Sequence, residues 1–414
     1  GHRHRPDHLP VSVPSEILCE RSYGWFRQRL IGRIGMKYAI GIMSGSSADG
    51  IDAALVSIEG HGLGTKVTLV DSLSLDYEKD FKARLIAVAG GGSTTTYEIS
   101  ALNFLLGELF ADAAEALWKR NVDICPKIDF VASHGHTFWH EPRGLEYFGR
   151  NVRSTLQLGE FSCISERLGC PVVGDFRVRD VAAGGQGAPL VPFTAYILYA
   201  NDEKDIAIQN IGGIGNISMM KKGCGCEDVI AYDTGPGNMV IDALVKRYTN
   251  GCLNYDEGGS IALGAHIDEA LLSWMVSTDA YIPLPAPKTT GRELYGPNYV
   301  ERIVGKAAEM KVSMPDLIAT ATAFTAVCIE LALKNEGFVP DELVVNGGGA
   351  HNKAIIDHLQ RSLPKTKVVV GKDSDMKEAV AFVILANERL HESCNEVLSV
   401  TGARHYSSMG KVSI

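Results

Sequence analysis

The alternation of apolar runs with turns of small residues predicts two similar hairpins in this chain. The first pairs a strand at 38–43 with one at 53–58 across the small-residue turn 44–50. The second pairs strands at 206–208 and 217–220 across a glycine-rich turn. An apolar run, a tight turn and a returning apolar run are typical of antiparallel strands. Because the hairpins begin about 170 residues apart, they predict two halves of similar architecture that face each other.

Helical periodicity and further apolar runs complete an α/β pattern. In 97–120, apolar residues recur at helical spacing and form one stripe, which predicts a long helix packed on the core. Further helices are expected at 261–276, 317–334 (capped by Asp316) and 379–387, and further strands at 130–132, 171–174, 229–232 and 343–345. These strands run into polar or glycine-rich turns, and in open α/β sheets ligands bind beyond the carboxyl ends of the strands.

The composition is that of an ordinary soluble globular protein with room for two domains. The chain has 414 residues, of which 45% are hydrophobic and 21% charged, and its net charge is −9. The lack of a basic block argues against nucleic acid as a partner, and no run reaches the roughly 18 apolar residues of a membrane span. Nine scattered cysteines without disulfide or zinc spacing fit a reducing compartment, so we expect a cytoplasmic protein.

Residues 1–35 differ from the rest of the chain. They contain six Arg and three His but few acids, and Met36 directly precedes the first predicted strand. We expect this segment to be an extension outside the folded domains. An Arg-rich targeting helix at 25–34 is the alternative, although the acids and prolines nearby are unusual for one.

Asp233 is the strongest candidate for a catalytic group. It follows the predicted strand 229–232, begins the sequence Asp-Thr-Gly-Pro-Gly-Asn, and precedes a helical stretch at 239–245. A carboxylate between a strand and a helix start is well placed for chemistry, and the neighbouring glycines let a ligand approach the backbone. The alternative is a hairpin and a helix cap that merely use glycine and aspartate well.

The small-residue turns favour a nucleotide as a ligand. Turns with free N–H groups form anion cradles, so two of them across a cleft suit a polyphosphate. Asp49 and Asp52 add carboxylates that could hold Mg²⁺, directly or through water. A third turn at 346–352 contains Gly347, Gly348 and Gly349, and its bare backbone could admit a flat base.

Polar residues at two other strand ends are candidates for a second substrate. His134 and His136 flank a glycine after the strand 130–132, where they could contact sugar hydroxyls. Arg177 and Arg179 follow the strand 171–174 and could clamp a carboxylate or phosphate. A salt-bridged surface turn is the alternative for the arginines. The sequence lacks GxxxxGK[ST], GxGxxG, HExxH and GxSxG, which lowers the case for P-loop, dinucleotide-binding, zinc-protease and α/β-hydrolase proteins.

Seven motifs, in order along the chain, resemble those of the 1,6-anhydro-N-acetylmuramic acid kinases: GIMSGSSADGIDAALV, SHGHTFWHEP, DFRVRDVAAGGQGAPLVP, NIGGIGNIS, DTGPGNMVIDA, PKTTGRELYG and VVNGGGAHN. The resemblance extends from Lys37 to the C-terminus. It implies an actin-like ATPase and sugar kinase fold with two ribonuclease-H-like domains around an ATP cleft. It also implies that ATP and water open the 1,6-anhydro bridge, giving N-acetylmuramic acid 6-phosphate for cell-wall sugar recycling.

The resemblance implies roles for individual residues. Asp233 would be the base that takes a proton from water. The ATP site would include Gly45, Ser46, Ser47, Ala48, Asp49, Gly50, Ile51, Asp52, Gly212, Gly213, Asn216, Gly347, Gly348 and Gly349, with Mg²⁺ at Asp49 or Asp52. The amino sugar would contact His134, His136, Arg177, Arg179 and Asp180, and an arginine would meet its lactyl carboxylate. A homodimer is also implied.

Three residues depart from the family pattern. Ser46 and Ala48 replace the usual Thr and Leu, and His136 stands where Gln is usual. Because histidine titrates near neutrality, we expect His136 to alter the sugar affinity or the pH optimum.

We expect two domains. The first consists of 36–181 together with about 398–414, and the second consists of 182–397. A kinase for another sugar on the same fold is one alternative function. A non-catalytic actin-like ATP-binding protein is another, but such a protein would not need the polar cluster of the sugar site.

Overall fold

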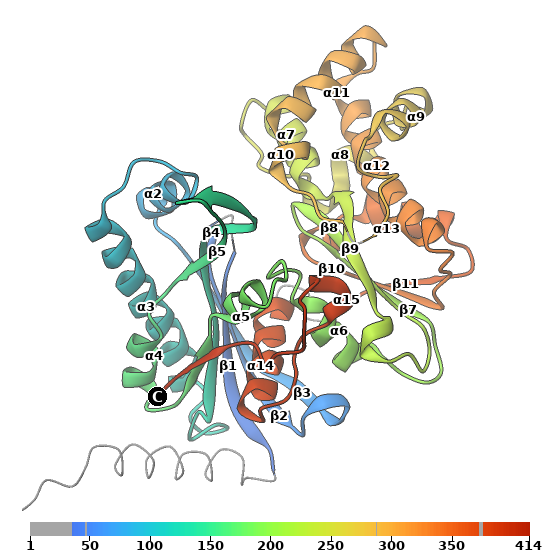
Figure 1. Ribbon diagram of the computed structural model, residues 1–414. Helices are drawn as coiled ribbons and strands as arrows, with labels where there is room; N and C mark the ends of the chain where they lie inside the picture. Colours follow the sequence, from blue (N-terminus) through green and yellow to red (C-terminus); the bar gives the residue numbers. More distant parts are fainter. Residues whose placement is uncertain (1–34, 46–47, 287, 372–375) are drawn as a thin grey trace, which may run out of the picture.

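The computed structural model describes residues 35–45, 48–286, 288–371 and 376–414, and it contains two β-sheets flanked by helices (Figure 1). The first sheet consists of β1 (Lys37–Ser44), β2 (Gly50–Glu59), β3 (Lys66–Asp76), β4 (Phe130–Tyr147), β5 (Arg150–Leu158), β6 (Val172–Gly174) and β12 (Lys411–Ser413). The second consists of β7 (Ile206–Ile211), β8 (Ile214–Met220), β9 (Ile230–Pro236), β10 (Glu342–Asn346) and β11 (Lys367–Val370).

The two sheets share one strand order. In the first, the order is β12-β6-β4-β1-β2-β3, with β5 paired to β4, and in the second it is β11-β10-β7-β8-β9. In each sheet the first three strands form an antiparallel meander, and the fourth strand pairs parallel with the first. This 3-2-1-4-5 arrangement confirms the α/β class with two ribonuclease-H-like units. The predicted hairpins at 38–58 and 206–220 are β1–β2 and β7–β8.

Helices cover both faces of the first sheet. They are α2 (Lys79–Ala89), α3 (Thr96–Lys119), α4 (Phe161–Leu168), α5 (Phe176–Ala182) and α14 (Lys377–Leu390), with the short turn η1 (Gly62–Gly64). The short helix α15 (Leu398–Thr401) lies instead against β9 of the second sheet. The core on the side of α3 includes Leu106 and Phe110. On the other side, α14 lies against β1 so closely that a Cβ at Gly41 would stand 2.0 Å from the Ala379 carbonyl oxygen. Only glycine fits this crossing.

The placement of α14 bears on the expected division of the chain. The expected second unit, 182–397, included this helix, but α14 packs against β1 and β4 of the first sheet. Its apolar residues Phe382 and Leu385 share a core cluster with Ile206 and Val344 of the second sheet. The helix therefore fills the space between the two sheets, as Figure 1 also shows.

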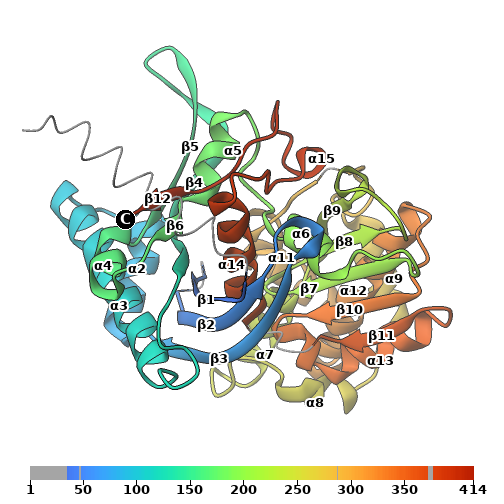
Figure 2. The ribbon, with the colours of Figure 1, turned by 90° about the horizontal axis from the view of Figure 1, so that it is seen from below.

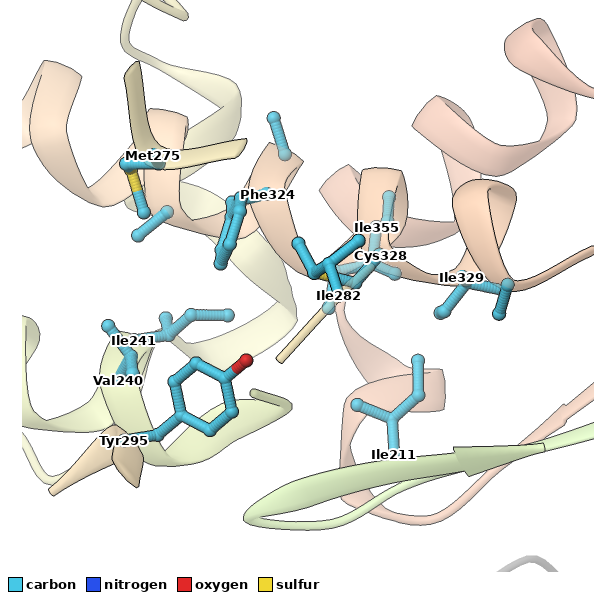
Figure 3. Close-up of a cluster of buried hydrophobic side chains, with 14 of the residues drawn as sticks. Ile211, Val240, Ile241, Met275, Ile282, Tyr295, Phe324, Cys328, Ile329 and Ile355 are labelled. Carbon is cyan, nitrogen blue, oxygen red and sulfur yellow. The ribbon is translucent and has the colours of Figure 1, made fainter. Parts of the chain in front are cut away.

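The second sheet carries the larger helical cover. Its helices are α6 (Val191–Tyr199), α7 (Asn238–Tyr248), α8 (Ser260–Leu263), α9 (Glu269–Thr278), α10 (Arg292–Tyr295), α11 (Pro297–Glu309), α12 (Met314–Asn335) and α13 (Lys353–Ser362), with the turns η2 (Cys226–Asp228), η3 (Glu257–Gly259) and η4 (Gly348–His351). Figure 3 shows Phe324 and Cys328 of α12 in one cluster with Ile241 of α7 and Tyr295 of α10.

Two helix predictions differ from the structure. The expected helix 261–276 is divided into α8 and α9, with non-helical residues between them. The cap of α12 is Ser313 rather than Asp316, because the Ser313 hydroxyl accepts the Asp316 N–H (3.3 Å). Among the described residues, α12 is the one helix long and apolar enough to cross a membrane, yet 78% of its apolar window is buried inside the protein.

Candidate active site

A cleft of about 1110 Å³ opens between the two units. Asp49 and Lys82 line it from the first unit, and Gly212 and Gly213 line it from the second, together with residues of α7, α10 and α11. The turns of the two predicted hairpins therefore border the same space. Figure 2, the view from below, shows β1–β2 and β7–β8 on either side of α14.

Asp233 lies in the middle of β9 and is half-buried, so the expectation that it follows the strand is wrong, because β9 continues to Pro236. Its Oδ2 accepts hydrogen bonds from the Thr289 hydroxyl (2.8 Å) and from the Thr290 backbone N–H (3.0 Å). Burial raises the pKa of Asp233 above its ordinary value, and these two hydrogen bonds oppose that shift. A carboxylate with a raised pKa and uncharged partners is suited to accept a proton in a reaction.

The loop that holds Asp233 is anchored in the second core. The Tyr281 hydroxyl donates to the Asp233 carbonyl (2.8 Å), and the Asp233 N–H donates to the Lys288 carbonyl (3.3 Å). The Lys288 ammonium donates to the carbonyls of Tyr281 (3.3 Å) and Ile282 (2.8 Å), and it lies 4.7 Å from the centre of the Tyr281 ring. These contacts fix the backbone of the loop relative to β9.

Asn216 lies beside Asp233. The two residues are directly paired across β8 and β9. Residues opposite each other on antiparallel strands project to the same face, with Cβ atoms about 5 Å apart. The structure therefore places Asn216, expected at the ATP phosphates, next to the candidate base.

The first small-residue turn presents one carboxylate to the cleft. Asp49 is exposed in the wall of the cleft and forms an ion pair with Lys82. Gly50 has no room for a side chain, because a Cβ there would stand 2.1 Å from the Leu75 carbonyl oxygen. Ile51 is 3% exposed and belongs to the core. Of the other expected members of this turn, Gly45 accepts the Ala48 N–H (2.9 Å), and Ser46 and Ser47 lie outside the described residues.

The carboxylates of this turn fit a magnesium ion in chemical type. Asp52 accepts a hydrogen bond from the Ser74 hydroxyl (2.6 Å), and Asp49 faces the cleft. Mg²⁺ in phosphate-transfer sites is held by one or two carboxylates together with phosphates and water. No cluster of three or more His, Cys, Asp or Glu side chains that could hold a metal occurs in the described part of the chain. These two aspartates therefore fit a metal that is held mainly by its nucleotide.

The second turn is joined to the start of α7. The Gly212 carbonyl accepts the Asn238 N–H (2.7 Å), and the Gly213 carbonyl accepts the N–H groups of Gly237 (2.9 Å) and Met239 (3.2 Å). A Cβ at Gly237 would stand 2.3 Å from the Gly212 oxygen, so this contact requires glycine. The sequence motif DTGPGN thus ties the β7–β8 turn to the helix that follows Asp233.

The third glycine turn adjoins a second cavity. Gly348 lines a space of about 450 Å³ together with residues of α7 and η3, and Asp242 of α7 borders both this cavity and the main cleft. Gly347 has φ +77°, and a Cβ at Gly349 would stand 2.3 Å from the Ile211 side chain. The two outer glycines therefore allow the turn to pack on β7, while Gly348 borders the cavity beside Asn238. Burial raises the pKa of Asp242 to about 6.

His134 and Arg177, two of the expected sugar contacts, are hydrogen-bonded to each other, His134 being buried and Arg177 half-buried. The Arg177 Nε donates to the His134 Nε2 (2.9 Å), and its Nη1 donates to the Gly187 carbonyl (2.6 Å). His134 is 2% exposed and packs on the Phe382 ring, with 4.7 Å between the ring centres. Burial and the neighbouring guanidinium hold the pKa of His134 well below its usual range. The imidazole is therefore a neutral acceptor.

His136 is also neutral near pH 7. It is 1% exposed, and its Nδ1 lies 3.1 Å from the Ser44 hydroxyl, which contacts the Tyr77 hydroxyl at 3.0 Å. Burial lowers the pKa of His136 to about 4. The expectation that His136 titrates near neutrality is therefore wrong, because an imidazole without an acidic partner loses its charge when it leaves water.

Asp180 and Arg179 differ in position although they are neighbours in sequence. Arg179 is exposed on α5, whereas Asp180 is fully buried. The Asp180 Oδ2 accepts the Gly187 N–H (2.5 Å), and a Cβ at Gly185 would stand 2.2 Å from the same oxygen. Asp180 thus holds the GGQGAP segment in place. Arg177 also binds this segment, because it donates a hydrogen bond to the Gly187 carbonyl.

The structure adds residues that the sequence did not single out. Thr289 and Thr290 belong to the motif PKTTGRELYG. Thr289 lies 56 residues after Asp233 in the chain, so the sequence does not show that the two are hydrogen-bonded. Glu378, at the start of α14, interacts electrostatically with Arg177 and Asp52. Glu378 is solvent-accessible, yet the surrounding protein desolvates its carboxyl and raises its pKa. No motif in the sequence pointed to this neighbourhood of Glu378, because Arg177 and Asp52 are distant from it in the chain.

Comparisons with known proteins agree with the resemblance seen in the motifs. The model of the anhydro-N-acetylmuramic acid kinase family matches residues 37–414. The kinase of that name from Caldanaerobacter subterraneus subsp. tengcongensis is 46% identical over 386 residues, covering 91% of this chain and 97% of its own. The one from Clostridioides difficile is 42% identical over 384 residues, covering 91% and 98%.

Among solved structures, the activator of the 2-hydroxyisocaproyl-CoA dehydratase from Clostridium difficile with bound ADPNP is similar over 86% of this chain and 96% of its own. The two share 13% sequence identity with a TM-score of 0.42. At that level of similarity, the strand order of the two sheets remains the evidence for the fold.

Proposed function

The chain belongs to the anhydro-N-acetylmuramic acid kinase family, and we propose that its reaction takes place at Asp233, between the nucleotide cleft and the sugar. The protein is a phosphotransferase of cell-wall sugar recycling. The proposed reaction is the ATP-dependent opening of 1,6-anhydro-N-acetylmuramic acid by water to N-acetylmuramic acid 6-phosphate. The observation that best supports this assignment is the half-buried Asp233 carboxylate, whose pKa burial raises and whose Oδ2 accepts hydrogen bonds from two neutral groups.

In the proposed reaction, Asp233 takes a proton from the water that attacks the anomeric carbon. The bond from that carbon to the bridging oxygen breaks, and the bridging oxygen, still attached to C6, receives the γ-phosphoryl group. An alkoxide is a poor leaving group, so its capture by phosphoryl transfer removes the developing negative charge. A positioned base contributes about 10² to 10⁴ in rate, and positioning of the phosphates contributes much of the rest.

We assign the nucleotide to the main cleft and the adjoining cavity. The backbone turns around Asp49 and at Gly212–Gly213 face each other across the cleft and offer small residues to a polyphosphate. Gly348 opens the cavity of about 450 Å³ to a base. Asp49 and Asp52 are the carboxylates that would hold Mg²⁺, which neutralises phosphate charge when it is bound.

The buried polar residues of the first unit take a positioning role in this proposal. His134, which lies within β4, and Arg177 join this strand to the GGQGAP segment, and Asp180 accepts a hydrogen bond from the same segment. Arg179 is the exposed member of the expected sugar set. We also propose a cytoplasmic location, in keeping with the free cysteines among the described residues and with an intracellular recycling reaction.

The test is a coupled assay of ADP release by the purified protein with 1,6-anhydro-N-acetylmuramic acid, with mass spectrometry of the product. We expect sugar-dependent ADP release and a product heavier than the substrate by one water and one phosphoryl group. A product that gains only the phosphoryl group would contradict the hydrolytic step. Release of ADP with a different sugar but not this one would favour the alternative of another sugar kinase.

A further inference from the structure

Two acidic side chains are buried together in the first unit. Asp180 lies on α5 and is fully buried, and Glu396 lies between α14 and α15 and is 2% exposed. The two carboxyl groups are joined by a hydrogen bond. Because an ionised carboxylate can only accept, a hydrogen bond between two carboxyl groups requires a proton on one of them. The burial of both groups therefore points to one proton held in the interior of the protein.

The other hydrogen bonds of the two residues leave one oxygen for this proton. The Asp180 Oδ2 accepts the Gly187 N–H (2.5 Å). The Asp180 Oδ1 is buried and, apart from the Glu396 carboxyl, has no hydrogen-bond partner among the residues that the structure describes. The Glu396 carboxyl accepts hydrogen bonds from the Ser407 N–H and from the Ser407 hydroxyl (3.1 Å). A buried oxygen without a donor is destabilising, and a proton on Glu396 supplies that donor.

The surroundings of the pair favour one negative charge over two. Burial raises the pKa of Glu396 to about 7; the hydrogen bonds from Ser407 oppose this shift, and the Asp180 carboxylate adds to it. The Arg177 guanidinium interacts with Asp180 and offsets one charge. Further titratable or charged groups at these segments are His140, whose pKa burial lowers, the thiol of Cys394, and Arg404, which donates to the Ala182 carbonyl (3.5 Å). A single proton therefore leaves one carboxylate opposite one guanidinium.

The pair links two segments that are distant in the sequence. The GGQGAP segment, residues 184–189, packs against the segment 396–409, where the Gln186 N–H donates to the Thr401 carbonyl (2.9 Å). The carboxyl pair adds a side-chain link between the same two segments, because each carboxyl also accepts a backbone N–H from one of them. The GGQGAP segment is therefore held in part by the segment that follows α14.

We propose that Asp180 and Glu396 share one proton at neutral pH, and that Glu396 is thereby a positioning residue for the sugar side of the active site. Asp180 holds Gly187, and the Gly187 carbonyl accepts the Arg177 Nη1 (2.6 Å), so the pair acts on Arg177 through the backbone of the GGQGAP segment. Loss of the proton sets two carboxylates against each other and weakens this hold. The positioning role rests on the proposed function, whereas the shared proton does not.

The first experiment compares the stability of Glu396→Gln with that of the wild type across pH. The amide donates to Asp180 and accepts from Ser407 at every pH, as the protonated carboxyl does. The wild type takes up a proton on folding between the ordinary glutamate pKa of about 4.3 and about 7, so its stability falls as the pH rises through this window. Relative to the wild type, the variant should gain up to about tenfold in the folding equilibrium constant per pH unit within the window, and nothing further above it.

Two further variants and a spectrum complete this test. Glu166→Gln is the matched control, because Glu166 is exposed on α4 of the same unit, and its stability difference from the wild type should not follow this pH window. Glu396→Ala leaves Asp180 and Ser407 without their partner, so it should be less stable than the wild type at every pH. The infrared difference spectrum between the wild type and Glu396→Gln should contain the band of a protonated carboxyl at pH 6 and lose it at pH 9.

The kinetic readout is the KM for 1,6-anhydro-N-acetylmuramic acid at saturating ATP. If sugar binding needs the protonated pair, the wild-type KM should rise above about pH 7 by up to about tenfold per pH unit, because the protonated fraction falls. The KM of Glu396→Gln should stay level over the same range. The KM for ATP should be the same in both proteins, because the pair acts on the sugar side.

The outcomes separate this inference from the proposed function. A stability difference that does not vary with pH, or a carboxylate band in place of the carboxyl band at pH 6, would mean that Glu396 is ionised and would overturn the shared proton. The same KM profile in the wild type and Glu396→Gln would overturn the positioning role. Lack of turnover with this sugar would overturn the proposed function and the positioning role, whereas stability and the infrared spectrum decide the shared proton independently.

Discussion

The third strand of each sheet carries an aspartate, and the two carboxylates have opposite environments. On β3, Asp71 accepts hydrogen bonds from Arg120 (2.6 and 2.8 Å) and from Asn121 (2.6 Å), and the Arg120 guanidinium lowers the pKa of Asp71 to about 2. On β9, the Asp233 carboxylate accepts hydrogen bonds from the neutral groups of Thr289 and Thr290, and burial raises its pKa.

The difference shows that strand order does not define a reactive position. The strand β3 is an edge strand with exposed and half-exposed residues, and the end of α3 places an arginine beside it. The strand β9 is also an edge strand, but the loop before α10 and the helix α12 cover it. The pKa of Asp233 is raised because the covering segments remove water and the groups that donate to its carboxylate are neutral.

The largest effect is expected from Asp233→Asn. Loss of the proton acceptor should lower sugar-dependent kcat by about 10² to 10⁴ and leave ATP binding intact. Asp71→Asn, on the corresponding strand of the first sheet, is the control and should retain the wild-type rate. The measurement is ADP release together with nucleotide binding by calorimetry. Equal rates in Asp233→Asn and the wild type would contradict the base assignment.

The packing of α14 against the first sheet should make Gly41 sensitive to any side chain. In Gly41→Ala, the added Cβ would stand 2.0 Å from the Ala379 carbonyl oxygen, so the free energy of unfolding should fall by about 1–3 kcal/mol. The matched control is Gly305→Ala in α11, where a Cβ meets nothing within 4 Å. There, stability should rise by about 0.5–1 kcal/mol, through helix propensity. Denaturant unfolding measures both, and similar changes in the two variants would contradict the close crossing.

The variant Thr289→Val tests how the neighbouring hydroxyl affects the pKa of Asp233. An ionised Asp233 is needed as base, so activity falls as the pH drops through its raised pKa. The Thr289 hydroxyl lowers that pKa, and its removal should move the acid limb of kcat/KM to higher pH and lower kcat by about tenfold. Thr290→Val is the comparison, because Thr290 donates through its backbone, and its acid limb should stay in place. An unmoved limb in Thr289→Val would contradict the contact.

The smallest effect is expected at the exposed pair of the first sheet. The pKa of Asp71 is lowered on folding, so its contribution to stability is present above the ordinary aspartate pKa and is lost as the pH falls towards about 2. Because Arg120 is 45% exposed, Asp71→Asn should cost less than about 1 kcal/mol at pH 7. Unfolding at pH 7 and pH 3 measures the change, and a cost that stays constant between them would exclude an ionic origin.

Much of the fold could be predicted from local pattern. The hairpins β1–β2 and β7–β8 and the helix α3 lie where apolar periodicity placed them, whereas β9 extends past the predicted end of its strand and includes Asp233. The helix α14 shows the limit, because its apolar residues identify a buried helix but not the sheet that buries it. A crossing such as that of Gly41 with Ala379 joins residues more than 300 positions apart, and no local pattern encodes it.

The sequence by itself determined the two-unit α/β architecture, the family and the identity of Asp233 as the candidate base, because apolar periodicity and ordered motifs are properties of neighbouring residues. Only the tertiary structure decided that Thr289 and Thr290 hold Asp233, that His136 is buried and neutral, and that the buried carboxyl groups of Asp180 and Glu396 are hydrogen-bonded. Burial and proximity set pKa values and binding sites, and both depend on how distant segments of the chain pack together.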